Sequence, residues 1–213
     1  MARVIRHTHN SGHDLYIIDV GGDYVRVIVT STASVVRRWI STILYLRRRQ
    51  VYMQRLVVGI GVQWTPGGSD PPADTLQLCV GRHCLIFQLA HADSVPRNLR
   101  MFLNNSSHTF VGFWNHSDRR KLEHSEHRLH MRSDPLDLRY FAETENDESL
   151  VQDSVEEIVE KCLGYVVEQR REISMSHWDR KYLRKEQVAY ATVDAYCAFL
   201  VGRNSRVWNV ETL

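Results

Sequence analysis

Three side chains that could do chemistry stand at Asp118, Tyr190 and Asp194. Carboxylate oxygens are the ligands that magnesium prefers, so the two aspartates are candidate metal ligands. Tyr190 lies four residues before Asp194, and on a helix this spacing places both side chains on one face, one turn apart. Gln63 could add one neutral amide oxygen, a poorer magnesium ligand than a carboxylate.

Each of these residues also has an ordinary structural interpretation. An aspartate that follows a strand, as Asp118 does, is most often a helix cap. An isolated aspartate within a helix usually lies on a solvated face, and an isolated tyrosine usually belongs to the core. The segments around the three residues must therefore decide between the two interpretations.

Those segments alternate between strand and helix patterns. Leu56 to Gln63 is a short apolar run that predicts a central strand buried on both faces. A strand at Thr109 to Phe113 precedes a polar helix from Asp118 to His127, and Lys185 to Val201 predicts the last helix. Further elements are expected at residues 15–20, 24–29, 35–46, 75–80, 84–89, 95–103 and 150–163. Strands followed by alternating strands and helices indicate an α/β domain with a mixed central sheet flanked by helices.

The length of 213 residues suits one globular unit. Within it we expect an N-terminal hairpin and helix in residues 1–50, packed on a core formed by residues 51–213. No apolar run is long enough to cross a bilayer and no signal-peptide core is present, so we expect a cytoplasmic protein, also nuclear, without membrane contact. A formal charge of +2 is too small to indicate nucleic acid by itself.

Four cysteines, at positions 79, 84, 162 and 197, all lie in apolar surroundings. Cys79 and Cys84 flank an expected turn at Val80 to His83, where a disulfide is sterically conceivable. Buried reduced thiols are the alternative, and an intracellular setting favours them.

Three blocks of the chain occur in a set order: Arg55 to Gln63 with Trp64-Thr65-Pro66, Thr109 to Gly112 with Asp118, and Gln187 to Tyr196. In order and spacing they resemble the DnaQ-like 3′→5′ exonucleases, specifically the tyrosine-type branch with Werner-like and ribonuclease D-like nucleases. The resemblance implies a ribonuclease H-like fold and a Mg²⁺ or Mn²⁺ cofactor. It also implies that Asp118 and Asp194 bind metal and that Tyr190 orients the attacking water.

The chain departs from that family at its first block, where an Asp-x-Glu pair is expected and Gly61 and Gln63 stand instead. Formal charge at the site falls from about −4 to about −2, so two divalent ions would be poorly neutralised. Three outcomes stay open. The site binds one metal and works slowly, or it is silent, or other acids complete it, with the candidates Asp70, Asp74, Glu123 and Asp137.

A narrower resemblance joins residues 60–66, 69–80 and 172–176 to the plant RISC-interacting clearing 3′→5′ exoribonucleases and their hexameric relatives. It implies a homohexamer, with the helix from Val35 to Arg49 or its hairpin near a contact. It further implies single-stranded RNA as substrate, including RISC cleavage fragments, and Argonaute as a partner. The alternative is a catalytically impaired nuclease-fold protein that binds RNA or assembles complexes. A weaker third hypothesis is a DNA exonuclease.

Several other residues could have a functional role, but their neighbours in the sequence favour a structural one. His124, His127 and His130 recur every third residue, but arginines and a lysine surround them, which favours a solvated basic helix over a metal site. His7 and His9 fall in an N-terminus expected to be frayed. Two tryptophans near the blocks, Trp114 and Trp178, could stack bases, although core packing explains them equally well.

Overall fold

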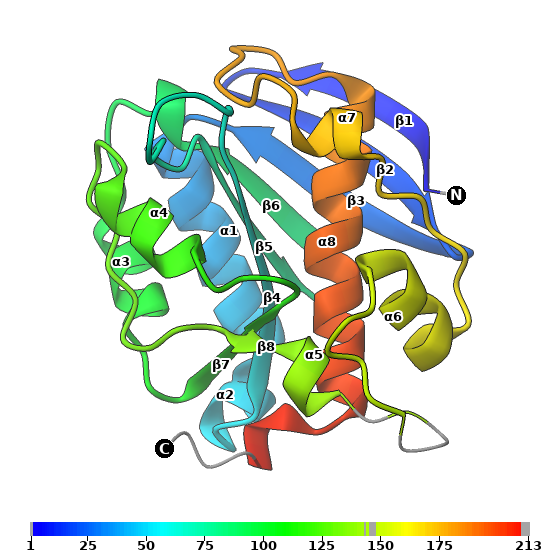
Figure 1. Ribbon diagram of the computed structural model, residues 1–213. Helices are drawn as coiled ribbons and strands as arrows, with labels where there is room; N and C mark the ends of the chain where they lie inside the picture. The colour runs from blue at the N-terminus through cyan, green and yellow to red at the C-terminus, as the bar shows by residue number, and fades with distance from the viewer. Residues whose placement is uncertain (1, 143, 145–147, 210–213) are drawn as a thin grey trace.

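One curved sheet of eight strands organises the molecule, and the computed structural model describes residues 2–142, 144 and 148–209 (Figure 1). The strand order across the sheet is β1-β2-β3-β6-β5-β4-β7-β8. The strands are β1 (Arg3–Asn10), β2 (His13–Val20), β3 (Asp23–Thr30), β4 (Leu56–Gln63), β5 (Thr75–Val80), β6 (His83–Gln88), β7 (His108–Gly112) and β8 (Leu136–Asp137).

Strand directions make this a mixed sheet, as expected from the sequence. The first three strands form an antiparallel meander, and β3 then pairs in parallel with β6. The strands β6, β5 and β4 form a second antiparallel set, after which β7 and β8 are added in parallel. Strand β4 is interior to the sheet, as its uninterrupted apolar sequence predicted.

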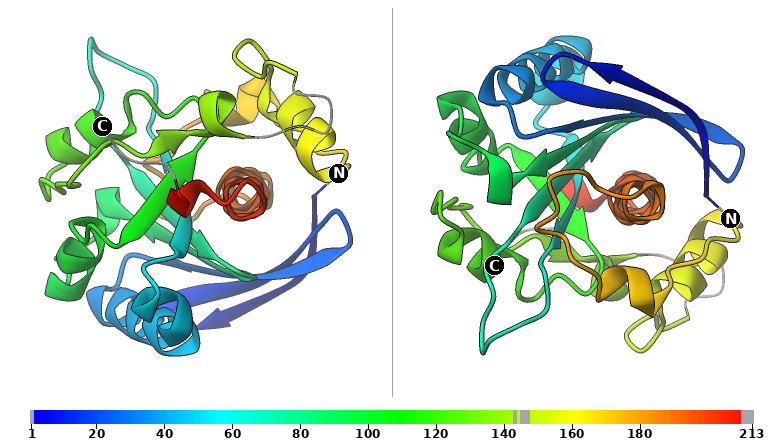
Figure 2. Two further views of the ribbon diagram at one scale, coloured as in Figure 1. Left: turned by 90° about the horizontal axis from the view of Figure 1, so that it is seen from below. Right: turned by 90° about the horizontal axis from the view of Figure 1, so that it is seen from above.

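Helices cover both faces of the sheet. In Figure 2 the sheet curls around α8, while α1 and α3 lie against its outer face. The helices are α1 (Ala33–Leu46), α2 (Arg48–Tyr52), α3 (Arg97–Leu103), α4 (Asp118–His124), α5 (Leu138–Phe141), α6 (Val155–Leu163), α7 (Arg171–Ser174) and α8 (Lys185–Asn204), with short 3₁₀ turns η1 (Leu89–His91) and η2 (Val207–Asn209). Nowhere in the described ranges does a helix have the length and apolar character that a membrane crossing requires.

The close approach of α8 to β4 depends on Gly59. A Cβ atom built on Gly59 would lie 1.9 Å from the carbonyl oxygen of Ala195, so only glycine fits there. Because strand side chains alternate between the two faces, Gly61 and Gln63 point to the same side as Gly59. The first block of the sequence therefore faces the helix that carries the last block.

Two sequence expectations differ from the structure at element ends. Helix α6 begins at Val155 rather than near residue 150, because Ser154 and Glu157 form a reciprocal capping box at this point. The N-terminus is not frayed, since residues 3–10 form strand β1 and the His7 ring stacks on Tyr16 at 4.1 Å.

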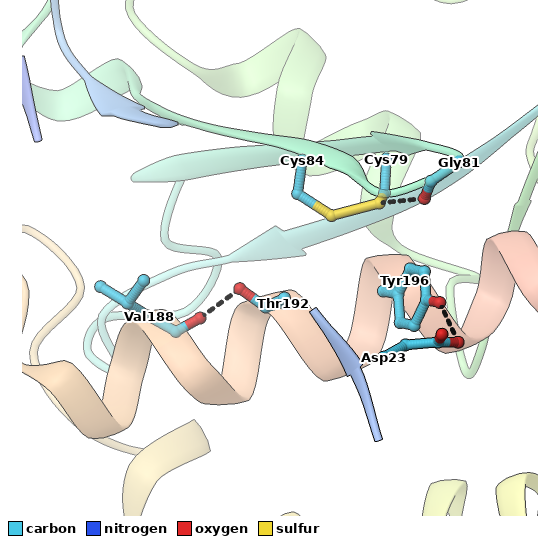
Figure 3. Close-up of a disulfide and its surroundings, with 7 residues drawn as sticks. All are labelled: Asp23, Cys79, Gly81, Cys84, Val188, Thr192 and Tyr196. Carbon is cyan, nitrogen blue, oxygen red and sulfur yellow. Dashed lines mark hydrogen bonds between the residues drawn. A yellow bond between two sulfur atoms is a disulfide. The ribbon is translucent and has the colours of Figure 1, made fainter. Parts of the chain in front are cut away.

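Cys79 and Cys84 are joined by a disulfide that crosses the β5–β6 hairpin (Figure 3). The expectation of reduced thiols is wrong for this pair. The two residues lie directly opposite each other in the ladder, with Cα atoms 4.2 Å apart, and both side chains are buried. Cys197 is buried and Cys162 is half-buried.

Candidate functional site

Asp118, Asp194 and Gln63 converge where the carboxyl end of β4 meets α8. Gln63 Nε2 donates a hydrogen bond of 3.0 Å to Asp194 Oδ2 across 131 residues of sequence. Asp118 begins α4 and lies close enough to Asp194 for that charge to raise its pKa. Three separate blocks of the sequence therefore meet at one place.

Two glutamine amides hold the Asp194 carboxylate from both sides. Gln63 donates to one oxygen, and Gln169 Nε2 donates to Oδ1. Burial nevertheless raises the pKa of Asp194 to about 7, and the charge of Glu156 adds to that rise while the two amides oppose it. Neutral amides orient this carboxylate without supplying the positive charge that it lacks.

Asp118 is a buried carboxyl without a cationic partner. Its side chain is 6% exposed, and no group in the described ranges donates a hydrogen bond to it. Burial raises its pKa well above the usual range, and the charges of Asp194 and Asp137 raise it further. The N-cap position of α4 is Ser117, so the helix-cap interpretation of Asp118 does not hold.

Tyr190 lies one turn before Asp194 on α8, as the spacing predicted. Its hydroxyl is hydrogen bonded to the Ser174 side chain, and its ring lies 6.0 Å from that of Trp178. Burial raises the pKa of Tyr190, and the nearby charges of Asp194 and Glu156 add to the effect. The phenol therefore stays protonated and can act as a hydrogen-bond donor beside Asp194.

The space beside Gly61 is taken by Gln77 of the neighbouring strand. The two residues are paired across β4 and β5, and a Cβ on Gly61 would lie 2.9 Å from Gln77 Oε1. That amide oxygen is buried and finds no hydrogen-bond partner among the described residues, although Nε2 of the same side chain donates to Thr75. An unpartnered acceptor thus stands where the related nucleases would carry their first acid.

The four acids considered as replacements are mostly occupied elsewhere. Asp70 pairs with Lys121 at 2.7 Å, Asp74 accepts the backbone N–H of Thr65 at 2.6 Å, and Glu123 pairs with Arg119. Asp137 does lie near Asp118, but Arg139 neutralises it at 2.7 Å. Of the four, only Asp137 belongs to the site, and it belongs as half of an ion pair.

Sequence reasoning missed three residues that shape the site, namely Gln77, Glu156 and Gln169. Glu156 is in the first turn of α6, and its Oε1 accepts the backbone N–H of Gln169 at 2.9 Å, which fixes Gln169 beside Asp194. The alternation of β5 could have pointed to Gln77, because it is a polar residue in an otherwise apolar strand. No local signal marks the other two, whose roles arise from packing between distant segments.

The side chains of the site fit a divalent metal ion only in part. No group of three His, Cys, Asp or Glu side chains gathers closely enough to hold a metal anywhere in the described ranges. The buried carboxyl of Asp118, the half-buried one of Asp194 and the buried, unpartnered amide oxygens of Gln77 and Gln169 remain. This donor set fits one partly hydrated Mg²⁺ or Mn²⁺, since such sites often use one or two carboxylates together with substrate phosphates.

Both tryptophan rings pack against other side chains of the protein. Trp178 is fully buried against Tyr190, so its ring cannot stack on a base. Trp114 is 43% exposed, but the Arg139 guanidinium lies 3.5 Å from its ring centre. Of the histidines, His124 contacts Asp70 and His130 contacts Glu123. The helix expected to reach His127 ends at His124, so His127 and His130 lie beyond it.

Comparison with known proteins places the chain among 3′-5′ exonucleases. Exonuclease 3′-5′ domain-containing protein 2 of Drosophila melanogaster is 30% identical over 147 residues, which is 68% of this chain and 24% of that protein. The WRN exonuclease/helicase of Mus musculus is 27% identical over 154 residues, 68% of this chain and 10% of that protein. The chain thus spans a quarter or less of the length of these two relatives.

Solved structures show the same fold. The Nibbler EXO domain of Aedes aegypti superposes with a TM-score of 0.66 at 16% identity, covering 84% of this chain and 87% of that one. RNase D of Escherichia coli gives 0.64 at 15% identity, covering 84% and 44%. The ribonuclease H-like exonuclease fold is therefore confirmed. Residues 69–202 match the 3′-5′ exonuclease family over more than half of the chain, and the chain belongs to that family.

Proposed function

We propose that this chain is a slow, metal-dependent 3′→5′ exoribonuclease that acts on single-stranded RNA. The observation that carries the proposal is the convergence of the buried Asp118 and the half-buried Asp194. Desolvation raises the pKa of both carboxyls, the charge of Asp194 raises that of Asp118 further, and no described cation pairs with either. Such a pair in a family of nucleases is the expected state of a metal site that awaits its ion. The choice of RNA draws support from the fold shared with RNase D, which is described as an exoribonuclease.

Asp118 and Asp194 would hold the metal, with Gln63 as a neutral contact to metal, water or terminal ribose. The metal, when bound, supplies positive charge for the phosphate and lowers the pKa of an attacking water. Tyr190 keeps its proton and can orient that water by a hydrogen bond. Glu156 and Gln169 position Asp194, because they fix the amide that holds its second oxygen.

The proposal predicts slow turnover. With Gly61 and Gln63 in place of two acids, the site offers about half of the anionic charge that two divalent ions require. One metal can still bind, but stabilisation of the leaving oxygen by a second ion is lost. Manganese should support activity better than magnesium, since its affinity for oxygen and nitrogen donors tolerates a less ideal ligand set.

The test is hydrolysis of 5′-labelled single-stranded RNA by purified protein in Mg²⁺ or Mn²⁺, compared with DNA of the same sequence. A ladder that shortens from the 3′ end, depends on metal and vanishes with chelator supports the proposal. DNA shortened faster than RNA would favour the DNA exonuclease instead. Equal products from wild type and Asp194→Asn would mean that the activity lies elsewhere.

A second candidate is a non-catalytic RNA-binding or assembly module, and the amides of Gln63 and Gln169 favour it. Their hydrogen bonds occupy both oxygens of Asp194, which can make the metal-free arrangement the stable one. Tight binding of 3′-ended RNA without any metal-dependent cleavage would establish this role.

The assembly and partners remain proposals of the same kind. We propose a homo-oligomer, with six copies the expected number, and RISC cleavage fragments bound by Argonaute as a source of substrate. The outer edge of β1 is compatible with assembly, because none of the described strands pairs with it. Light scattering across micromolar concentrations tests the oligomer, and a monomer at all of them would refute it.

A further inference from the structure

A second candidate binding surface lies at the N-terminal end of β4, away from Asp118 and Asp194. Here a groove of about 390 Å³ opens between α2, the start of β4 and the end of α8. We call it the arginine groove and define it by Arg47, Arg49, Arg55, Arg203, Phe199 and Trp208. An adjoining hollow shares Arg47, Phe199 and Arg203 with it and adds Arg82.

Most of the positive charge of the groove has no carboxylate partner among the described residues. Within the described ranges, no carboxylate pairs with Arg47, Arg49 or Arg55 (compare the ion pair of Arg82 with Asp23). Arg203 instead donates to the neutral side chain of Asn204 at 3.0 Å and lies 5.7 Å from the Phe199 ring centre. Four clustered guanidinium groups repel one another, and an anionic ligand would relieve this repulsion.

Arg47 is held in place by the turn between β5 and β6. A Cβ on Gly81 would lie 2.0 Å from the Arg47 guanidinium, so the absence of a side chain lets the arginine lie directly on the turn. Gly81 has φ +61°, a conformation that also favours glycine. An arginine fixed in this way loses less conformational entropy when it binds phosphate than a freely moving one does.

The floor of the groove is apolar and aromatic. Leu56, Val57 and Val80 line it beside Phe199, and half-buried Trp208 closes one side. Arginines beside an aromatic platform are the combination by which proteins hold single strands, with the cations on phosphates and the rings on bases. A volume near the lower end of the range for ligand sites suits about one nucleotide.

We propose that the arginine groove is a second binding site for single-stranded nucleic acid, separate from the carboxylate cleft. It would hold one base against the half-buried Trp208 ring and the adjacent phosphates on Arg47, Arg49 and Arg55. The choice of ligand class rests on the proposed function, whereas the site itself rests on the groove.

The two sites lie at opposite ends of β4, with Arg55 next to its first residue and Gln63 as its last. Eight residues of strand span about 23 Å at roughly 3.3 Å per residue. A strand that occupies both sites must cover at least this distance. Long oligonucleotides should therefore use the groove and the cleft together, while very short ones should not.

The test measures binding without cleavage, using the full chain with Asp194→Asn and chelator present. Fluorescence anisotropy would compare a labelled oligonucleotide of about 16 nucleotides with one of about 4, the range of single-strand site sizes. The groove variant is Arg49→Gln with Arg55→Gln. The matched control is Arg6→Gln with Arg97→Gln, which removes the same charge at two exposed arginines of β1 and α3.

We expect the groove variant to bind the longer strand about tenfold more weakly, and the control to change less than about twofold. The slope of log K against log salt should fall by about 1.4 in the groove variant, since two phosphate contacts are lost at about 0.7 each. Trp208→Ala should weaken binding with an unchanged salt slope, because it removes stacking and no charge. All variants should keep the thermal midpoint of the parent.

Equal weakening by the groove and control variants would overturn the proposal, because only net charge would then matter. So would a groove variant that binds the long strand normally but loses binding to vesicles containing phosphatidylserine, which would assign the groove to a lipid surface. A loss of RNA hydrolysis in a groove variant does not count for or against this binding site. If the wild type cleaves nothing but the groove variant loses affinity, the proposed function fails and the groove stands.

Discussion

Two aspartates on or beside α8 have opposite surroundings. Asp23, the first residue of β3, accepts a hydrogen bond from Tyr196 at 2.6 Å (Figure 3). It also accepts one from Tyr165 at 3.2 Å and forms an ion pair with Arg82. Asp194, two residues from Tyr196, is held only by amides and lies near two further acids. The pKa of Asp23 is lowered, chiefly by the Tyr196 hydrogen bond, and that of Asp194 is raised by burial to about 7.

This difference distinguishes a carboxylate that the protein itself neutralises from one that, under the proposed function, would bind a metal ion. A chain that can surround Asp23 with donors and a guanidinium could have done the same for Asp194. Leaving a buried acid without a cation costs stability, and such costs are concentrated at functional sites. The arginine groove shows the opposite imbalance, with cations left without anions. The following changes test this contrast, from the largest expected effect to the smallest.

Asp194→Asn should reduce metal-dependent RNA hydrolysis by at least about 100-fold, since loss of groups merely supporting a metal ligand already costs 10- to 100-fold. The initial rate of 3′-end shortening measures this. Asp179→Asn, at an exposed position, is the matched control and should keep the wild-type rate. An Asp194→Asn rate equal to that of the control would remove Asp194 from the site.

Without metal, stability should fall as pH rises from about 4 to about 7, because folded Asp194 has a pKa of about 7 and holds its proton more tightly than the unfolded chain does. The expected loss is on the order of 2 kcal/mol. Urea unfolding at several pH values with chelator measures it. In Asp194→Asn this slope should be smaller, and the part that remains comes from Asp118, whose pKa is also raised by burial. Asp23, with its lowered pKa, should lose its contribution only as pH falls below about 4.

Gly61→Asp combined with Gln63→Glu should raise Mn²⁺ affinity at least about tenfold, since it restores two anions to the site. The new Cβ at position 61 meets only the end of the flexible Gln77 side chain, which can move. Isothermal titration calorimetry measures the change. Gly61→Asn alone, with similar shape and no charge, is the control, and equal affinities in the two variants would show that charge does not limit metal binding.

Tyr196→Phe should destabilise the fold by about 1.5 kcal/mol, because it removes a hydrogen bond to the charged Asp23 carboxylate. Tyr165→Phe removes the longer bond to the same oxygen and should cost less. Urea unfolding at neutral pH compares them. Neither variant should change Mn²⁺ affinity, and a change would mean that the surroundings of Asp23 and Asp194 are coupled.

Much of the fold could be predicted because local patterns and long-range structure agree. The apolar run of β4 and the spacing of Tyr190 and Asp194 both carry over directly into the structure. The start of α6 was missed because the pattern placed the helix near residue 150, whereas the capping box at Ser154 begins it later. Strand β1 was missed because its polar sequence forms a strand only through pairing with β2.

The candidate site was predictable only in part. Motif order led to Asp118 and Asp194, but no spacing rule links Gln169 or Glu156 to a helix 25 or more residues away. Gln77 reaches the site only through the register of β4 and β5, which a sequence does not display. The environment of a carboxylate, and hence its pKa, depends on such contacts.

Gly59 determines how closely β4 approaches α8 beside the candidate site, because it has no Cβ atom. Since nothing but hydrogen separates the β4 backbone from the Ala195 carbonyl, the gap between sheet and helix cannot narrow, and any added methyl group must widen it. The distance between β4 and α8 is therefore set at position 59, and the hydrogen bond from Gln63 to Asp194 depends on that distance. Restoring acids at positions 61 and 63 by mutation therefore requires that position 59 stay glycine. New side chains at 61 and 63 can meet Asp194 only while position 59 has none.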